Sequence, residues 1–229
     1  MSAEAQKRAA GEAAAGLVED GMIVGLGTGT TAAFFVEAVA ARGARPRCVA
    51  TSEATAALAR ALGLEVIDLD AAGHIDLTVD GADEIGPDLS LIKGGGAALL
   101  REKLVWLASR RRVVIADAGK RVKTLGAFPL PIEVVAFGHA GTARRIENVL
   151  AGEGFAAPPV LRVGEGQAVW TDGGNLIYDI ACQAIAEPAR LAAALKSLTG
   201  VVDHGLFLGL AERALIGTDG GVTTIFPRG

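Results

Sequence analysis

A lysine, a run of three glycines and a glutamate follow one another in the segment LIKGGGAALLREKL (residues 91–104). Consecutive glycines let the backbone turn its N–H groups inward as a nest for an anion, and Lys93 stands directly before this nest. A lysine there could stabilise negative charge that develops on a substrate oxygen. The segment therefore predicts an oxyanion site that is made of the four residues Lys93, Gly94, Gly95 and Gly96.

Glu102 follows the glycines in a predicted helix, and its neighbours at the helical spacings i±3 and i±4 are all apolar. Without a local salt bridge, desolvation should raise the pKa of this carboxyl group toward the range of a general base. Arg101 and Lys103 also have apolar neighbours, so the alternative is that the three charged residues form the solvated strip of a mostly buried helix. The pattern alone leaves both interpretations open.

Acidic residues gather in VDGADEI (79–85), at the end of a predicted strand. The cluster is compatible with a metal site, an acid/base set or a solvated turn. A metal site is disfavoured, because the segment has no histidine and supplies few oxygen ligands in sequence. The acidic residues of this segment are Asp80, Asp83 and Glu84.

The segment GLGTGTT (25–31) follows a strand and opens a helix, where free N–H groups and the helix dipole favour an anion. A dinucleotide fingerprint would need glycine at position 30, and a Walker A loop would need a lysine before Ser/Thr. The remaining interpretations are a cradle for a single phosphate monoester and a tight turn with capping threonines. The candidate phosphate ligands are Thr28, Gly29, Thr30 and Thr31.

A phosphate cradle, a carboxylate base and a lysine at an oxyanion site together favour proton abstraction next to a carbonyl group. The sequence shows no cofactor motif and no metal-ligand spacing, and its three histidines lie far apart. Hydride transfer is therefore not supported, and we expect neither a cofactor nor a metal.

The elements that would hold these residues alternate between short apolar strands and helices. Such alternation predicts βαβ units and a mostly parallel sheet with helices on both faces, with ligands beyond the carboxyl ends of the strands. The predicted strands are 22–27, 48–51, 65–69, 74–85 and 111–119; the predicted helices are 3–20, 30–43 and 53–63; residues 90–110 pass from strand to helix.

The pattern changes after residue 120 to βαββαβ, which is typical of a small two-layer α+β domain of the split-βαβ type. Residues 212–226 predict a hairpin that could return to the first sheet. We therefore predict one domain from 1–127 plus 205–229, and a smaller one from 128–204. Within the smaller domain, the predicted strands are 128–138, 159–171, 175–182 and 201–210, and the helices are 139–152 and 187–200.

Composition excludes several classes of protein. The 229 residues carry a net charge of −4 and no Lys/Arg block, which argues against nucleic-acid binding. The mean hydropathy is +0.39, yet the longest uncharged run, 21–36, is too short to span a bilayer. The N-terminus has no apolar signal region, and Cys48 and Cys182 stand alone, so we expect a cytoplasmic protein with two reduced thiols.

The blocks GLGTGTTA, VDGADEI, IKGGGAALLREK, IADAGK and FPLPIEV, in this order and spacing, resemble the A-type ribose-5-phosphate isomerases. The resemblance implies interconversion of D-ribose 5-phosphate and D-ribulose 5-phosphate through an enediolate, without metal or coenzyme. It also implies a Rossmann-like domain with a smaller ferredoxin-like α+β domain, assembled as a homodimer or homotetramer.

The resemblance also implies roles for individual residues. Glu102 resembles the base that moves a proton between C1 and C2, and Lys93 to Gly96 the stretch that holds the enediolate oxygen. Asp80, Gly81, Ala82 and Asp83 match the segment that contacts sugar hydroxyls and assists ring opening. Residues 28–31 match the phosphate loop; Lys120 matches a substrate-binding lysine, and Lys7 a further phosphate contact.

An alternative function is a non-catalytic sugar-phosphate sensor of related fold. Such proteins usually carry a DNA-binding helix-turn-helix, for which no room remains before the first predicted strand near residue 22. The isomerase is therefore the leading hypothesis.

Overall fold

A computed structural model of the protein describes residues 1–227, and its largest element is a seven-stranded sheet in the order β16-β15-β7-β4-β1-β2-β3. All neighbours are parallel except β15 and β16, which form the predicted terminal hairpin. The six parallel strands thus follow the 3-2-1-4-5-6 order of a Rossmann-like sheet. The strands are β1 (Ile23–Leu26), β2 (Arg47–Ala50), β3 (Glu65–Val66), β4 (Ile75–Asp80), β7 (Ser109–Asp117), β15 (Arg213–Thr218) and β16 (Gly221–Ile225).

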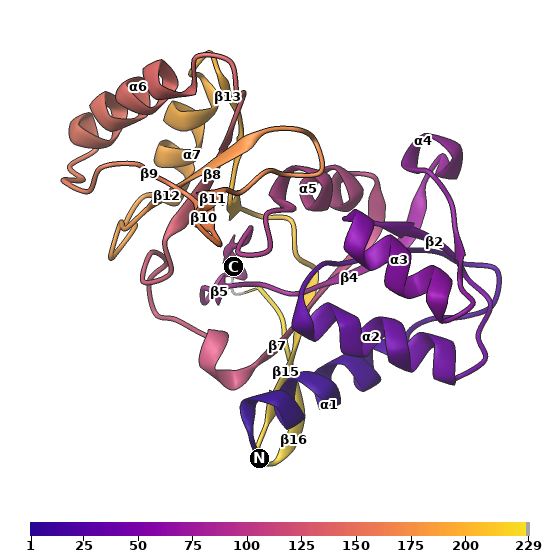
Figure 1. Ribbon diagram of the computed structural model, residues 1–229. Helices are drawn as coiled ribbons and strands as arrows, with labels where there is room; N and C mark the ends of the chain where they lie inside the picture. Colours follow the sequence, from indigo (N-terminus) through magenta and orange to yellow (C-terminus); the bar gives the residue numbers. More distant parts are fainter. Residues whose placement is uncertain (228–229) are drawn as a thin grey trace.

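Helices cover both faces of this sheet, as predicted (Figure 1). Along β7, Val113 and Ile115 face the core beneath α1, α2 and α3, whereas Val114 and Ala116 face the core that holds Trp106 of α5. This alternation is the period of two expected for a strand that is buried on both sides. The helices are α1 (Ala3–Ala15), α2 (Thr30–Ala41), α3 (Glu53–Ala61), α4 (Leu69–Ala72) and α5 (Leu99–Leu107).

A second, four-stranded sheet has the order β13-β8-β12-β9, with antiparallel neighbours throughout. In chain order this is 4-1-3-2 with two helices, the predicted ferredoxin-like arrangement. The helices lie at the far end of the molecule from α1 (Figure 1). The elements are β8 (Leu130–Val134), α6 (His139–Gly152), β9 (Val160–Leu161), β12 (Leu176–Ile180), α7 (Pro188–Lys196) and β13 (Val201–His204).

Short elements connect the two sheets. A three-stranded sheet in the order β14-β6-β5 pairs residues that follow the second sheet with residues that precede it. A two-stranded ladder, β10-β11, lies beside β9. These elements are β5 (Glu84–Ile85), β6 (Leu91–Ile92), β10 (Val163–Gly164), β11 (Gln167–Ala168), β14 (Leu206–Phe207) and the 3₁₀ helix η1 (Ala118–Lys120).

Several predicted elements are shorter in the structure. The helix predicted over 3–20 begins after the Ser2 cap as expected but ends at Ala15, where Gly16 is the C-cap. The strand predicted over 65–69 stops at Val66, because the next residues enter α4. The strand predicted over 201–210 is interrupted at Gly205, whose N–H donates to Pro131 O. The run 159–171 is broken into two-residue strands, between which Glu165 and Gly166 have positive φ.

Neither cysteine is paired in the described chain: Cys48 and Cys182 are free and buried. Burial raises the pKa of the Cys48 thiol to about 12 and that of Cys182 to about 11. Both therefore behave as small apolar side chains. Among residues 1–227, no helix has both the length and the apolar character that a membrane crossing requires.

Candidate active site

A pocket of about 110 Å³ opens where β1 and β4 end. This is the point at which the strand order reverses, where ligands bind in sheets of this type. A larger cavity of about 290 Å³, between α3 and α5, contains none of the predicted site residues. The smaller pocket is lined by Lys7, Thr28, Gly29, Thr30, Thr31, Gly81, Ala82, Asp83, Lys93, Gly94, Gly95, Gly96, Glu102 and Lys120. The structure thus brings all the predicted site residues to one place, except that Asp80 lies beneath the pocket.

Lys93 lies between two carboxylates at the floor of the pocket. Its Nζ is 3.0 Å from Asp80 Oδ2 and 3.2 Å from Glu102 Oε1, and it donates to Gly81 O at 2.6 Å. The side chains of Lys93, Asp80 and Glu102 are 2%, 0% and 5% exposed. The second oxygen of Glu102, Oε2, has no hydrogen-bond partner among residues 1–227. The glutamate therefore has one oxygen anchored and one available.

One ammonium group cannot neutralise two carboxylates, and the pKa values reflect this. Burial, and then the charge of Asp80, raise the pKa of Glu102 to about 8, although Lys93 opposes the shift. Burial also raises the pKa of Asp80, again against the effect of Lys93. For Lys93, burial acts to lower the pKa, but the two carboxylates outweigh it and the pKa is raised. Lys93 therefore stays charged while Glu102 can exchange a proton near neutral pH.

Asp80 holds the loop that follows β1. Its Oδ1 accepts hydrogen bonds from the N–H groups of Thr28 at 3.1 Å and Gly81 at 2.7 Å. The loop comes so close that a Cβ at Gly27 would lie 2.1 Å from Asp80 Oδ1. Glycine at position 27 is therefore needed for this approach.

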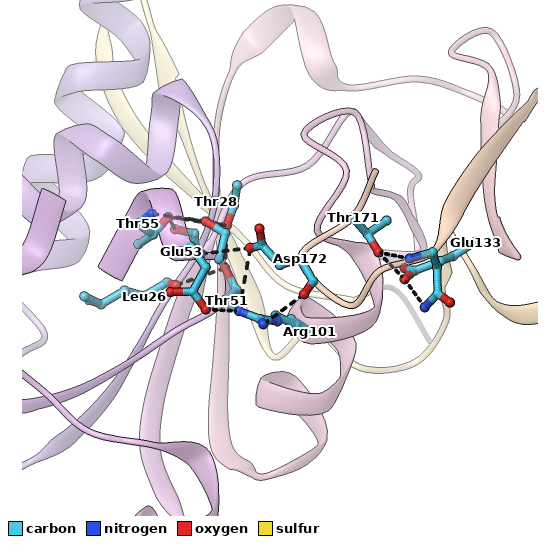
Figure 2. A network of polar contacts seen from close by, with 12 residues as sticks. Leu26, Thr28, Thr51, Glu53, Thr55, Arg101, Glu133, Thr171 and Asp172 are labelled. Atoms are coloured by element: carbon cyan, nitrogen blue, oxygen red, sulfur yellow. Dashed lines mark hydrogen bonds and ion pairs between the residues drawn. The ribbon is translucent and has the colours of Figure 1, made fainter. Parts of the chain in front are cut away.

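The hydroxyl group of Thr28 points away from the pocket, which corrects the expectation that it faces a phosphate. Its Oγ1 lies 2.7 Å from Thr51 Oγ1 and 2.9 Å from Ser52 Oγ, and Thr55 Oγ1 is 3.3 Å away (Figure 2). Thr51, Ser52 and Thr55 are buried, and sequence reasoning missed this cluster. The one sequence signal for this cluster was the position of Ser52, directly before the helix predicted over 53–63.

The other loop residues remain free to meet an anion. Gly29 caps α2 without a side-chain hydrogen bond, so no side chain caps the first N–H groups of the helix, and Gly29, Thr30 and Thr31 line the pocket. Lys7 of α1 reaches the same place, with its Nζ 3.4 Å from Thr30 Oγ1. Lys120 reaches the pocket from η1. The positive charges therefore gather at one end, opposite the buried carboxylates.

The side chains of Asp83 and Glu84, in the acidic segment after β4, point to different places. Asp83 lines the pocket and accepts a hydrogen bond from Gly95 N at 2.8 Å. One N–H of the predicted glycine nest is therefore already bound to a carboxylate. Glu84 points elsewhere, because its two oxygens accept from Gly126 N and Phe128 N.

The charged residues of α5 do not form one solvated strip, because Glu102 is buried while Arg101 is partly exposed, so that alternative does not hold for Glu102. Glu102 is buried, while Lys103 pairs with Asp203 and donates to His204 O. Arg101 pairs with Glu53 of α3 and with Asp172 in the turn before β12 (Figure 2). Three consecutive residues thus contact three different parts of the molecule.

A buried carboxylate whose pKa is raised to about 8, an ammonium group fixed beside it and a pocket that is also lined by Lys7 and Lys120 define a class of enzyme. It is one that moves a proton beside the carbonyl group of a small phosphorylated substrate. Among residues 1–227, no three His, Cys, Asp or Glu side chains are grouped so as to hold a metal ion.

Comparison with known proteins gives the particular family. The family model of ribose 5-phosphate isomerase A (phosphoriboisomerase A) matches residues 47–221. The ribose-5-phosphate isomerase A of Caulobacter sp. (strain K31) is 66% identical over 227 residues, covering 99% of this chain and 100% of that protein. The chain therefore belongs to the ribose 5-phosphate isomerase A family.

Solved structures agree with this assignment. The crystal structure of the ribose 5 phosphate isomerase A from Neisseria gonorrhoeae has a TM-score of 0.91 at 34% identity, covering 100% of this chain and 99% of that one. A D-ribose-5-phosphate isomerase in complex with phospho-erythronic acid has a TM-score of 0.91 at 35% identity, covering 99% and 100%. The protein is an aldose-ketose isomerase that interconverts ribose 5-phosphate and ribulose 5-phosphate, and not a non-catalytic sensor.

Proposed function

We propose that Glu102 is the base that carries the proton between C1 and C2 of the sugar phosphate. The observation that supports this role is the free Oε2 of Glu102, which belongs to a buried carboxylate that lines the pocket. A pKa of about 8 lets the group accept a proton from carbon in one half-reaction and return it in the other.

Lys93 and the glycines at 94–96 stabilise the enediolate oxygen in this proposal. The ammonium group is fixed by two carboxylates and by Gly81 O, so it needs no reorganisation when negative charge develops on the substrate. Because the site is buried, that charge is screened little by water.

The two aspartates have different roles in this proposal. Asp83 lines the pocket and contacts sugar hydroxyls, where it assists ring opening. Asp80 is fully buried, with Oδ1 bound to two N–H groups and Oδ2 paired with Lys93. We therefore revise its predicted contact with the sugar: Asp80 positions Lys93 and the loop at Thr28.

The phosphate end of the substrate is held by the cationic mouth of the pocket. Lys7, Lys120, the hydroxyl groups of Thr30 and Thr31, and the first N–H groups of α2 supply the contacts. Thr28 contributes shape only, since its hydroxyl group bonds to the buried cluster.

The test is Glu102→Gln, which removes the base and retains the shape of the side chain. We expect kcat to fall by roughly 10²-fold or more, with little change in the affinity for ribose 5-phosphate. Glu147→Gln, on the exposed face of α6, is the matched control and should leave kcat unchanged. Near wild-type turnover of Glu102→Gln would remove Glu102 from the role of base.

The cofactor, assembly and location of the enzyme are also proposals. We expect full activity after dialysis against EDTA, and a loss that is restored by a divalent ion would contradict this. We propose that the isomerase works in the cytoplasm. We also propose that it assembles as a homodimer or homotetramer, and exposed apolar side chains such as Phe137 and Leu107 support this assembly. Light scattering at working concentration should show two or four chains, and a monomer would overturn this proposal.

A further inference from the structure

Arg162 lies between β9 and β10, far in sequence from every residue of the pocket. Its backbone is fixed on both sides, because its N–H donates to Ile177 O and its carbonyl accepts from Val169 N. The side chain is 15% exposed and extends from the second sheet to the glycines at 94–95. No part of the proposed mechanism uses this arginine.

The guanidinium group is oriented by Asp179 of β12. Its Nε donates to Asp179 Oδ2 at 2.8 Å, and its Nη2 donates to Asp179 Oδ1 at 2.5 Å. This bidentate geometry fixes the plane of the fork and leaves Nη1 to make other contacts. Nη1 donates to Gly94 O at 2.7 Å and to Gly95 O at 3.2 Å.

Hydrogen bonds to consecutive carbonyl groups determine where the next N–H groups point. Gly94 O accepts from Ala97 N at 3.1 Å as well as from Arg162, whereas Arg162 is the one donor to Gly95 O among the described residues. In a planar trans peptide, the C=O of one residue and the N–H of the next point in opposite directions. Because Gly94 O faces Arg162, the N–H of Gly95 points the other way, where it donates to Asp83 Oδ2. Because Gly95 O also faces Arg162, the N–H of Gly96 points away from the arginine.

We propose that Arg162, oriented by Asp179, is a positioning residue that turns the Gly96 N–H toward the substrate oxygen. The inference rests on the proposed role of residues 93–96 as the site that holds the enediolate. The arginine itself contacts no substrate and acts only through the glycine segment.

Because residues 95 and 96 are both glycine, the orientation of the peptide between them must be fixed by a contact from outside the segment. The peptide between Gly95 and Gly96 has no Cβ on either side, so it can rotate at little steric cost. A rotated peptide would present the Gly95 carbonyl oxygen to the pocket, and the negative end of its dipole would repel an enediolate. The arginine thus determines whether the reacting oxygen faces the N–H or the carbonyl oxygen of this peptide.

The test uses Arg162→Met, with Arg190→Met as the matched control. Arg190 is also an arginine beside the second sheet with a carboxylate partner, but it is exposed and lies away from the glycines. We expect Arg162→Met to lower kcat roughly 10- to 100-fold while KM changes less than about threefold. The control should keep wild-type kinetics. A kcat of Arg162→Met within twofold of wild type, or a change confined to KM, would overturn the proposal.

Two further variants keep the test decisive if Arg162→Met folds poorly. Asp179→Asn should lower kcat in the same direction, and the double variant should be no slower than Arg162→Met alone, because both act on one contact. Arg162→Lys should stay impaired, since a point charge cannot hold two carbonyl groups. Wild-type turnover of Arg162→Lys would refute the positioning role.

Ligand binding separates a positioning effect from general damage. Phospho-erythronic acid carries a carboxylate where the substrate carries its reacting carbonyl, whereas inorganic phosphate tests the cationic mouth alone. In Arg162→Met, the affinity for the acid should fall in parallel with kcat, and the affinity for phosphate should not change. Equal losses for both probes would indicate general damage and refute the inference. If Glu102→Gln is inactive while Arg162→Met is normal, only this inference fails; an active Glu102→Gln would contradict the proposed function instead.

Discussion

Glu102 and Lys93 show how far single residues can be interpreted from the sequence. The apolar neighbours of Glu102 predicted a desolvated carboxyl group, and its pKa of about 8 confirms a raised value. Its ion pair with Lys93 could not be predicted, because a contact between the residue after strand β6 and helix α5 depends on tertiary packing. Asp80 was expected to meet the sugar, but burial places it behind Lys93. Motif position placed Asp80 near the pocket without showing which way its side chain points.

The pH dependence of activity should report the charge balance around Lys93. Ionised Asp80 helps to raise the pKa of Glu102, so Asp80→Asn should lower that pKa. If Glu102 must be ionised to act, kcat/KM rises with pH up to about 8 in the wild type, and this acid limb moves to lower pH in Asp80→Asn.

The measurement is the full pH profile of kcat/KM, and the position of the limb matters rather than its height. Asp70→Asn, on the exposed surface of α4, serves as the control and should leave the profile in place. A limb that stays in place or moves to higher pH in Asp80→Asn would contradict the assignment.

At the scale of elements, α1 is held against β15 by a close backbone contact. A Cβ at Gly217 would lie 1.9 Å from Gln6 O, the residue directly before Lys7. Gly11 makes a similar contact with α2, where a Cβ would lie 2.8 Å from Phe35 N. The two glycines thus determine how far Lys7 reaches into the pocket. Sequence periodicity predicted the helix but not this docking. In the sequence, the two glycines look like simple interruptions of the apolar pattern and do not show which element they contact.

Gly217→Ala should push α1 away from the sheet and withdraw Lys7. We expect KM for ribose 5-phosphate to rise several-fold with a smaller effect on kcat, and the free energy of unfolding to fall by about 1–3 kcal/mol. Gly220→Ala, in the adjoining turn, has room for a methyl group and is the control. Steady-state kinetics and urea unfolding provide both readouts, and an unchanged KM would show that the contact does not position Lys7.

At the scale of the whole molecule, a turn beside the second sheet is tied to α3 and α5 by side-chain contacts. Asp172, in the turn before β12, contacts both Arg101 and the N–H of Glu53 (Figure 2). The split-βαβ order and the return of the last hairpin were predicted correctly, since both follow from local patterns. These interdomain contacts were not, because nothing local marks them. The domain boundaries at 127/128 and 204/205 stay a prediction.

His204 makes the stability of the molecule depend on pH. It is buried, its Nδ1 accepts a hydrogen bond from Leu206 N, and Lys103, Lys196 and Asp203 surround it. Burial and then the charge of Lys103 lower its pKa from 6.5 to about 4, so the fold favours the neutral ring. The resulting stability is fully present above pH 6.5 and is lost as the pH falls toward 4.

Between pH 7 and pH 5, this group alone should lower the free energy of unfolding by about 2 kcal/mol. His204→Asn keeps an acceptor and removes the titration, so the difference between the two pH values should shrink by that amount. His74→Asn, at a half-exposed position, is the control. Urea denaturation at both pH values tests the prediction, and an equal difference in wild type and His204→Asn would disprove it.

The docking of α1 on β15 also has a consequence for the order of events during synthesis. Residues 3–15 leave the ribosome early, but their partner strand, residues 213–218, is made near the end. The apolar face of α1, with Ala10 and Ala14, must therefore wait for most of the chain before it is fully covered. Lys7, which follows the residue at this contact, takes its place beside Thr30 only after this step.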